Sequence, residues 1–194
     1  MTRRGWGQQR VAPASAGPGP PRPSTTIGHD VPMAKRITHD LTYDAPLAEV
    51  AAMLADPAFR QEVCDYQRVL RSSVEIEPDG AAGMRVRVEQ VQAAHGIPAF
   101  AQKFVGDEID IVQTETWTSA DHGDITVEIP GKPGDMRGTA KLRESGGTTT
   151  ETVDLTVKVG IPLIGGKLEG LIADLLLKAL RAENTVGRTW LARD

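Results

Sequence analysis

The 194-residue sequence is poor in cysteine, in aromatic residues and in long apolar runs. Its single cysteine, Cys64, excludes an intrachain disulfide framework and any zinc site built from several cysteines. A lone cysteine also fits a reducing compartment, so we expect a cytoplasmic protein. No stretch of about 18 uncharged apolar residues occurs, and we therefore expect no transmembrane segment.

Clustered positive charge is also scarce. Lysine and arginine number 22 against 26 aspartates and glutamates, which gives a formal net charge of −4. Because neutralisation of phosphates supplies most of the affinity for nucleic acids, we expect no nucleic-acid partner. Hydrophobic residues make up 40% of the chain and aromatic residues only 4%. This balance is typical of a globular chain whose core is mainly aliphatic.

The first 32 residues differ in composition from the rest. They carry 6 of the 13 prolines and four arginines against a single aspartate. Such a segment cannot bury enough apolar surface to fold, so we expect residues 1–32 to form a disordered Pro/Arg-rich tail. One interpretation is that the true start is Met33 and that the tail is an over-extended gene prediction. The other is a genuine basic tail, and the intact mass of the native protein distinguishes the two.

Residues 33–194 are expected to form one α+β domain. Alternation of apolar and polar residues predicts a strand over 37–43, and apolar spacings of three and four predict helices over 45–54 and 59–66, with Asp44 as the first N-cap. From residue 69 the period returns to two and predicts six further strands, mostly joined by hairpins and therefore antiparallel. The stretch 99–105 between two of these strands is expected to be a short helix or a lid.

A long amphipathic helix is predicted after the glycine-containing loop 160–166. Its apolar residues recur at spacings of three and four, and they are Leu168, Ile172, Leu175, Ala179, Ala182 and Val186. The opposite face carries charged residues, namely Lys167, Glu169, Asp174, Lys178 and Arg181. An apolar face this wide must be covered, and only the inner face of the predicted sheet is available to cover it.

Two kinds of cofactor site are disfavoured. The loop 160–166 superficially resembles a phosphate-binding loop, but Gly166 shifts Lys167 out of register and Leu168 lacks the hydroxyl that would bind magnesium. The four histidines occur singly, without the spacing of a metal site. We therefore expect no cofactor and no bound metal.

The order of one strand, two helices, six antiparallel strands and a long helix is that of the helix-grip fold. Through it the chain resembles the START-like and polyketide cyclase-like (SRPBCC) superfamily. It also resembles an uncharacterised actinobacterial family within that superfamily, through the run Gln113–Trp117, the turn Pro130–Pro133 and the loop Ile161–Glu169. The resemblance covers about residues 34–192. It implies a curved seven-stranded sheet that grips the long helix around an apolar cavity, and it brings no established catalytic residues.

Candidate ligand contacts follow from this arrangement. One group consists of strand residues in register with inward-facing apolar neighbours, namely His39, Tyr43, Gln113, Glu115 and Trp117. The other group consists of apolar residues of the long helix, namely Leu168, Ile172 and Leu175. A mainly apolar pocket needs a few polar groups to orient a ligand. An alternative is that these groups only bond one another across strands. An acid/base pair of His39 and Glu115 requires that the two lie within hydrogen-bond distance.

The resemblance implies binding of a hydrophobic small molecule, since members of the superfamily carry lipids, sterols, hormones or polyketides. We expect a lipid or polyketide-like metabolite between the sheet and the C-terminal helix. Two alternatives stay open. One is an enzyme of the cyclase, aromatase or dehydratase type that uses polar residues of the cavity, and the other is a protein-interaction module with a closed core.

Overall fold

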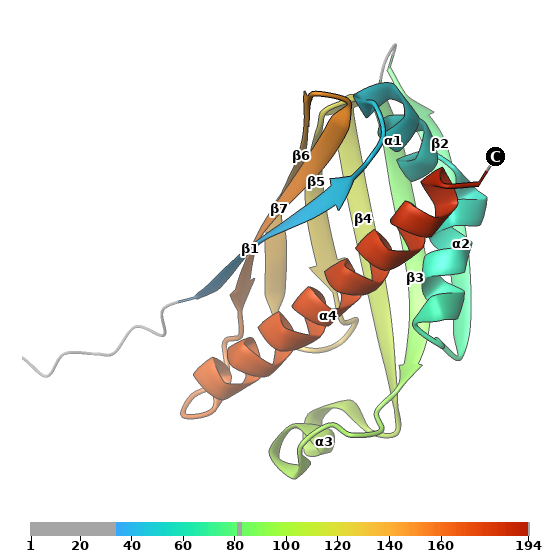
Figure 1. The fold of residues 1–194 in the computed structure, drawn as a ribbon. Coiled ribbons are helices and arrows are strands. Elements are labelled where there is room, and N and C mark those ends of the chain that lie inside the picture. The colour runs from blue at the N-terminus through green and yellow to red at the C-terminus, as the bar shows by residue number, and fades with distance from the viewer. Residues whose placement is uncertain (1–33, 81–82, 194) are drawn as a thin grey trace, which may run out of the picture. The chain divides into compact units, whose positions relative to one another are not determined.

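The computed structural model describes residues 34–80 and 83–193 (Figure 1). The expectations for the tail and for a start at Met33 lie outside these residues. The described elements are β1 (Lys35–Tyr43), α1 (Leu47–Leu54), α2 (Pro57–Tyr66), β2 (Arg71–Asp79), β3 (Gly83–Ala93), α3 (Ala99–Val105), β4 (Glu108–Ser119), β5 (His122–Glu128), β6 (Asp135–Ser145), β7 (Thr148–Lys158) and α4 (Gly165–Leu191).

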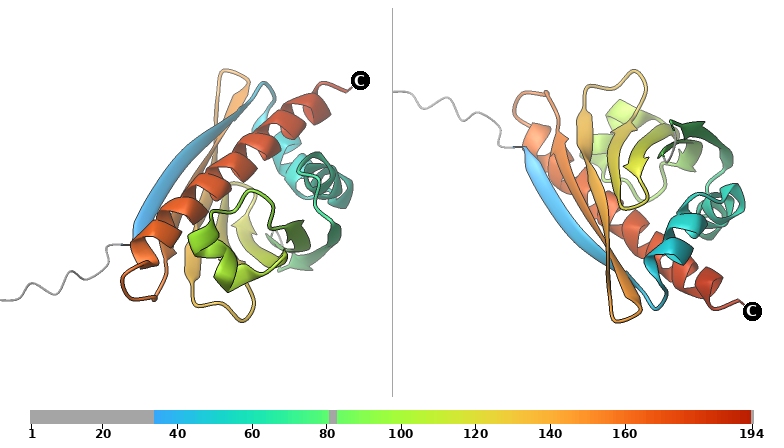
Figure 2. Two further views of the ribbon diagram at one scale, coloured as in Figure 1. Left: turned by 90° about the horizontal axis from the view of Figure 1, so that it is seen from below. Right: turned by 90° about the horizontal axis from the view of Figure 1, so that it is seen from above.

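The seven strands form one antiparallel sheet in the order β1-β7-β6-β5-β4-β3-β2. Strands β2 to β7 follow one another as a meander, and β1 pairs with β7, so the first and last strands of the chain lie side by side. The sheet curves around α4, which crosses its concave face (Figures 1 and 2). The predicted α+β helix-grip fold is confirmed.

The two short helices begin in different ways. Asp56 caps α2 as local chemistry predicts, because its carboxylate accepts the backbone N–H two residues later at 2.8 Å. The prediction that Asp44 caps α1 is wrong. That helix begins after Pro46, and the N–H of Leu47 donates to the carboxylate of Glu144 in β6 at 2.8 Å. An acceptor from a distant strand takes the place of the local cap.

The main core lies between the concave face of the sheet, α1, α2 and the C-terminal part of α4. Its largest fully buried apolar side chains come from both layers and are Leu41, Tyr43, Val50, Leu54, Phe59, Val86, Val153 and Val157. Gly187 lets α4 approach β1 closely, since a Cβ atom at this position would lie 2.6 Å from a ring carbon of Tyr43. None of the described helices has the length and apolar character needed to cross a membrane.

Helix α4 packs tightly near its two ends and less tightly in its middle. Its buried residues are Gly165, Leu168, Glu169, Ala173, Val186 and Gly187. Leu175 is 42% exposed, so its assignment to a buried stripe is wrong. The assignment of Glu169 to the solvent face is also wrong, because its buried carboxylate accepts the N–H of Val159 at 2.9 Å. The middle of the helix covers a cavity instead of packed side chains.

Candidate functional site

A cavity of about 500 Å³ lies between β3, β4, β5 and the middle of α4. We call it the outer chamber. Aliphatic side chains form much of its wall, among them Ile97, Ile109, Ile111, Val127, Ile129, Met136, Ile172, Leu175 and Leu176. Its volume falls within the range of small-molecule sites, which is roughly 300–1,000 Å³. The partial exposure of Leu175 places this residue at the mouth of the chamber.

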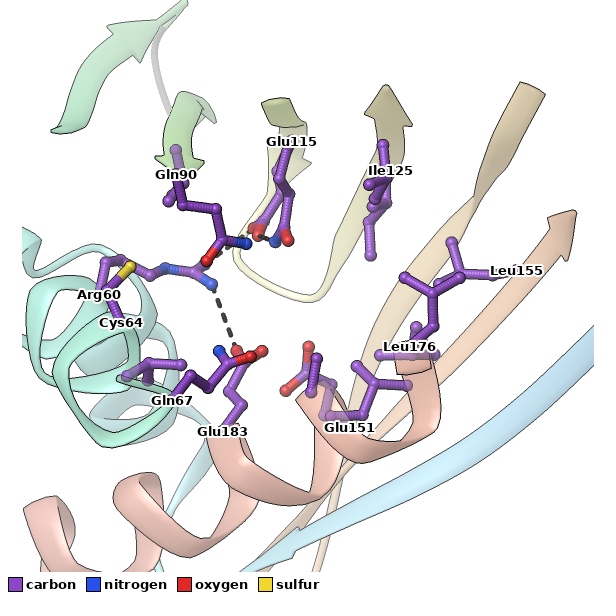
Figure 3. A pocket seen from close by; sticks show the side chains of 17 residues that line it. Arg60, Cys64, Gln67, Gln90, Glu115, Ile125, Glu151, Leu155, Leu176 and Glu183 are labelled. Atoms are coloured by element: carbon purple, nitrogen blue, oxygen red, sulfur yellow. Dashed lines mark hydrogen bonds and ion pairs between the residues drawn. The ribbon is translucent and has the colours of Figure 1, made fainter. Parts of the chain in front are cut away.

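A second, smaller cavity of about 70 Å³ continues the outer chamber toward the core (Figure 3). We call it the inner pocket. The two spaces share six lining residues, which are Gln67, Gln90, Gln113, Val127, Leu176 and Ala179. The inner pocket has room for a few water molecules or a small chemical group, but not for a lipid chain. Its wall is distinctive because it is charged.

Arg60 of α2 is the centre of this charged wall and is only 5% exposed. Its Nη2 donates to Oε2 of Glu115 in β4 at 2.8 Å, and its Nη1 donates to Oε1 of Glu183 in α4 at 3.2 Å. Its Nε donates to the carbonyl oxygen of Leu54 at 3.0 Å. One guanidinium therefore joins α2 to the end of α1, to the sheet and to the long helix.

Glu115 is the most fully bonded carboxylate of the inner pocket. Besides the bond from Arg60, its Oε1 accepts from Nε2 of Gln113 and its Oε2 accepts from the indole N–H of Trp117, both at 2.7 Å. The three β4 residues alternate along the strand and share its inner face, as predicted. They bond one another along this one strand, whereas the alternative interpretation given above expected bonds across strands. Gln113 and Glu115 also line the inner pocket, whereas Trp117 lines a separate hollow under α1.

Glu151 of β7 is bonded much less completely. It is 4% exposed, and its only hydrogen bond within the described part of the chain comes from the hydroxyl of Tyr43 to Oε2, at 3.4 Å. In the described residues no fully buried side-chain oxygen or nitrogen lacks a partner. The second oxygen of Glu151, Oε1, accepts no bond and must therefore be reachable from the inner pocket, toward which the side chain points in Figure 3.

Among the described residues, three glutamates and one arginine line the inner pocket, and the pKa values of Glu151 and Glu183 reflect this imbalance. Burial and the charge of Glu183 raise the pKa of Glu151 well above its ordinary value, against the opposing effect of Arg60. Burial also raises the pKa of Glu183, although Arg60 again opposes it. Burial lowers the pKa of Arg60, but the surrounding carboxylates outweigh burial and raise that pKa overall. Arg60 thus stays charged, and the raised pKa values favour proton uptake by Glu151 and Glu183.

The other predicted site residues lie in different places. Ile172 and Leu175 line the outer chamber, and Leu168 belongs to a separate apolar cluster with α3 and the loop before α4. His39 is half-buried on β1 and lines neither space. Strands β7, β6 and β5 separate β1 from β4, and no hydrogen bond joins His39 to Glu115 in the described chain. The proposed acid/base pair is therefore not formed, and ligand contact by the remaining residues stays a prediction.

Arg60, Glu151 and Glu183 were not among the predicted site residues. Two of them have a sequence signal, because Glu151 lies in the inward register two residues before Val153, and Glu183 follows Ala179 by four helical positions. Arg60 has no such signal, since its partners come from distant elements. The described residues contain no group of three or more histidine, cysteine, aspartate or glutamate side chains arranged to hold a metal ion.

A family model described as "Protein of unknown function (DUF2505)" matches residues 38–191. Among curated proteins, the uncharacterized protein Rv0481c of Mycobacterium tuberculosis is 31% identical over 112 residues. The match covers 54% of this chain and 64% of the relative, so it spans less than two thirds of that protein.

Solved structures show the same fold at low sequence identity. The Zhui aromatase/cyclase from Streptomyces sp. R1128 aligns with a TM-score of 0.55 and 12% identity, over 83% of this chain and 95% of that one. A START superfamily protein from Mycobacterium smegmatis aligns with a TM-score of 0.52 and 13% identity, over 79% and 95%. These similarities establish the architecture, and the residues of the two cavities must be interpreted by their own chemistry.

Proposed function

The chain belongs to the DUF2505 family, and we propose that this member binds a hydrophobic small molecule, a lipid or polyketide-like metabolite, in the outer chamber. The observation that carries the proposal is the chamber itself, about 500 Å³ of space with a largely aliphatic wall. Protein interiors are otherwise close-packed, and an unfilled apolar space costs stability. A space of this size therefore favours a ligand site over an interaction module with a closed core.

Native mass spectrometry of the protein purified from its own host tests the proposal. We expect a co-purified apolar compound that adds a defined mass to the folded protein and is lost on denaturation. A chamber-filling variant, Ala179→Trp, should lose this adduct, because Ala179 lies in the walls of both cavities. The control variant Ala48→Trp adds the same side chain to the exposed surface of α1 and should keep it. An adduct retained equally by both variants contradicts binding in the chamber.

An enzyme of the cyclase, aromatase or dehydratase type is the second candidate. The specific observation that favours it is the buried carboxyl of Glu151, which has a raised pKa and lies beside the Tyr43 hydroxyl. A carboxyl group with a raised pKa holds its proton to a higher pH than usual and can act as a general acid. Under this function, Glu151→Gln abolishes turnover of a bound polyketide-like substrate while the protein stays folded. Turnover that survives this substitution contradicts a catalytic role for Glu151.

A further inference from the structure

We infer that the ligand is an apolar amine, whose protonated nitrogen enters the inner pocket beside Glu151 and Glu183 while its apolar body occupies the outer chamber. The inference rests on the proposed function, since it specifies the chemistry of the ligand for the same cavity. It is carried by the charge balance of the inner pocket, by the bonding of Glu151 and by the sizes of the two spaces.

The charge balance of the inner pocket is negative. Three glutamates line it, and among the described residues Arg60 is the one positively charged side chain in its wall. The terminal nitrogens of Arg60 bond Glu115 and Glu183, and Glu115 accepts two further hydrogen bonds from its own strand. A buried carboxylate without a counter-charge is strongly unfavourable. The pocket therefore holds either an extra proton or a cation.

Glu151 is the carboxyl group that lacks such a partner. It is 4% exposed, the long bond from Tyr43 is its only hydrogen bond within the described residues, and its Oε1 faces the pocket. Glu183 lines the same pocket and has a single bond within the described chain, from Arg60 at 3.2 Å. An ammonium group has three N–H donors and can bond both carboxylates at once.

The sizes and the polarity of the two spaces favour a small cationic head group in the inner pocket. The inner pocket of about 70 Å³ admits a small group such as an ammonium, and only the outer chamber is large enough for the carbon skeleton. An anionic head group would meet three glutamates and an arginine that already pairs with two of them. The carboxyl groups also lack an arrangement that would hold a metal ion in the described residues. An organic cation fits these conditions.

Three probes with one carbon skeleton test the inference: decylamine, decanol and decanoate, each titrated into the full chain by isothermal calorimetry at neutral pH. We expect decylamine to bind about tenfold or more tightly than decanol, the ratio that one hydrogen bond to a charged group supplies. We expect decanoate to bind most weakly, because the glutamates repel its negatively charged carboxylate.

Matched substitutions locate the ammonium group. Glu151→Gln should reduce the affinity for decylamine about tenfold and leave that for decanol within about twofold. The control Glu75→Gln removes the same charge from an exposed position on β2 and should leave both affinities unchanged. If Glu151→Gln fails to fold, Glu183→Gln on a different element provides a second variant. It should likewise weaken the binding of decylamine more than that of decanol.

The outcomes separate this inference from the proposed function. If none of the three probes binds, the proposed function fails together with the inference. If all three probes bind equally, the chamber binds apolar molecules and the inference of an amine ligand is wrong. The same conclusion follows if both glutamate variants lose affinity for decylamine and decanol alike. If decanoate binds most tightly, a basic residue of the cavities, Arg60, Arg68 or Lys178, pairs with an anion. The inference is then overturned although the proposed function stands.

Discussion

The indole N–H of Trp117 and a guanidinium nitrogen of Arg60 donate to the same carboxylate oxygen, Oε2 of Glu115, at 2.7 and 2.8 Å. Trp117 is buried outside the inner pocket, yet it shares an acceptor with the residue at the pocket's centre. A change in the position or charge of Glu115 therefore alters the environment of the indole directly, through one hydrogen bond.

Trp117 should accordingly report ligand binding. In a full chain that carries Trp6→Phe and Trp190→Phe, Trp117 is the only tryptophan. Titration with decanol or decylamine should shift its emission saturably, because the ligand displaces water beside Gln113 and Glu115. Adding Ala179→Trp is unsuitable as a control here, so Ala179→Phe serves to block the chamber. A flat emission titration alongside calorimetric binding would show that the hydrogen bond does not transmit the change.

Removal of the central guanidinium should be costly for folding. Arg60→Met leaves the buried Glu115 and Glu151 and the partly buried Glu183 without their counter-charge. It should lower the free energy of unfolding by about 3 kcal/mol or more. Arg36→Met breaks an exposed ion pair with Asp154 and should lower it by less than about 1 kcal/mol. Urea denaturation at neutral pH measures both. Equal losses for the two variants would contradict a structural role for the buried network.

Stability should fall as the pH rises, through the titration of Glu151. Its pKa is raised above the ordinary value of 4.5 by burial, and Tyr43, Arg60, Glu115 and Glu183 face it. A raised carboxyl pKa means that the folded chain binds more protons than the unfolded chain between the two pKa values. Below about pH 4.5, the titration of Glu151 therefore does not lower the free energy of unfolding. The decrease grows as the pH rises through that window and is complete above the pKa of the folded state.

Glu151→Gln removes this titration, so the unfolding free energy of the variant should decrease less between mildly acidic and alkaline pH than that of the parent. Glu75→Gln, on the exposed face of β2, should follow the parent. Thermal melts across a pH series make the comparison. Parallel curves for all three proteins would indicate that Glu151 has the same pKa in both states.

Two positions of α4 should differ in how much stability the protein loses when a carboxylate is introduced. Ala173 is 1% exposed, and Ala173→Asp should destabilise the fold by several kcal/mol because it buries an unpaired charge. Leu175 lies at the mouth of the outer chamber, so Leu175→Asp should change stability by about 1 kcal/mol or less and weaken decanol binding. Melting temperature and calorimetry measure the two effects. Unfolding of Leu175→Asp would place that side chain in the packed core.

Local patterns predict the elements of this fold better than they predict its site. Alternation and helical spacing suffice for the seven strands and α4, since each pattern involves neighbours along the chain. Gln113 and Glu115 are found by register. Arg60 acquires its role from partners on three other elements, and periodicity along α2 does not reveal them. Leu175 has the spacing of a core residue, but spacing does not show that a cavity lies beneath it.

The position of α4 after all seven strands has a consequence for biosynthesis. The helix supplies Glu183, Leu176 and Ala179 to the walls of the cavities, whereas Arg60 and Glu115 belong to segments made much earlier. A nascent chain that has emerged only through β7 has Arg60 on α2 and two glutamates on an open sheet, and α4 does not yet cover the cavities. A bound ligand therefore stabilises only chains in which α4 has docked onto the sheet.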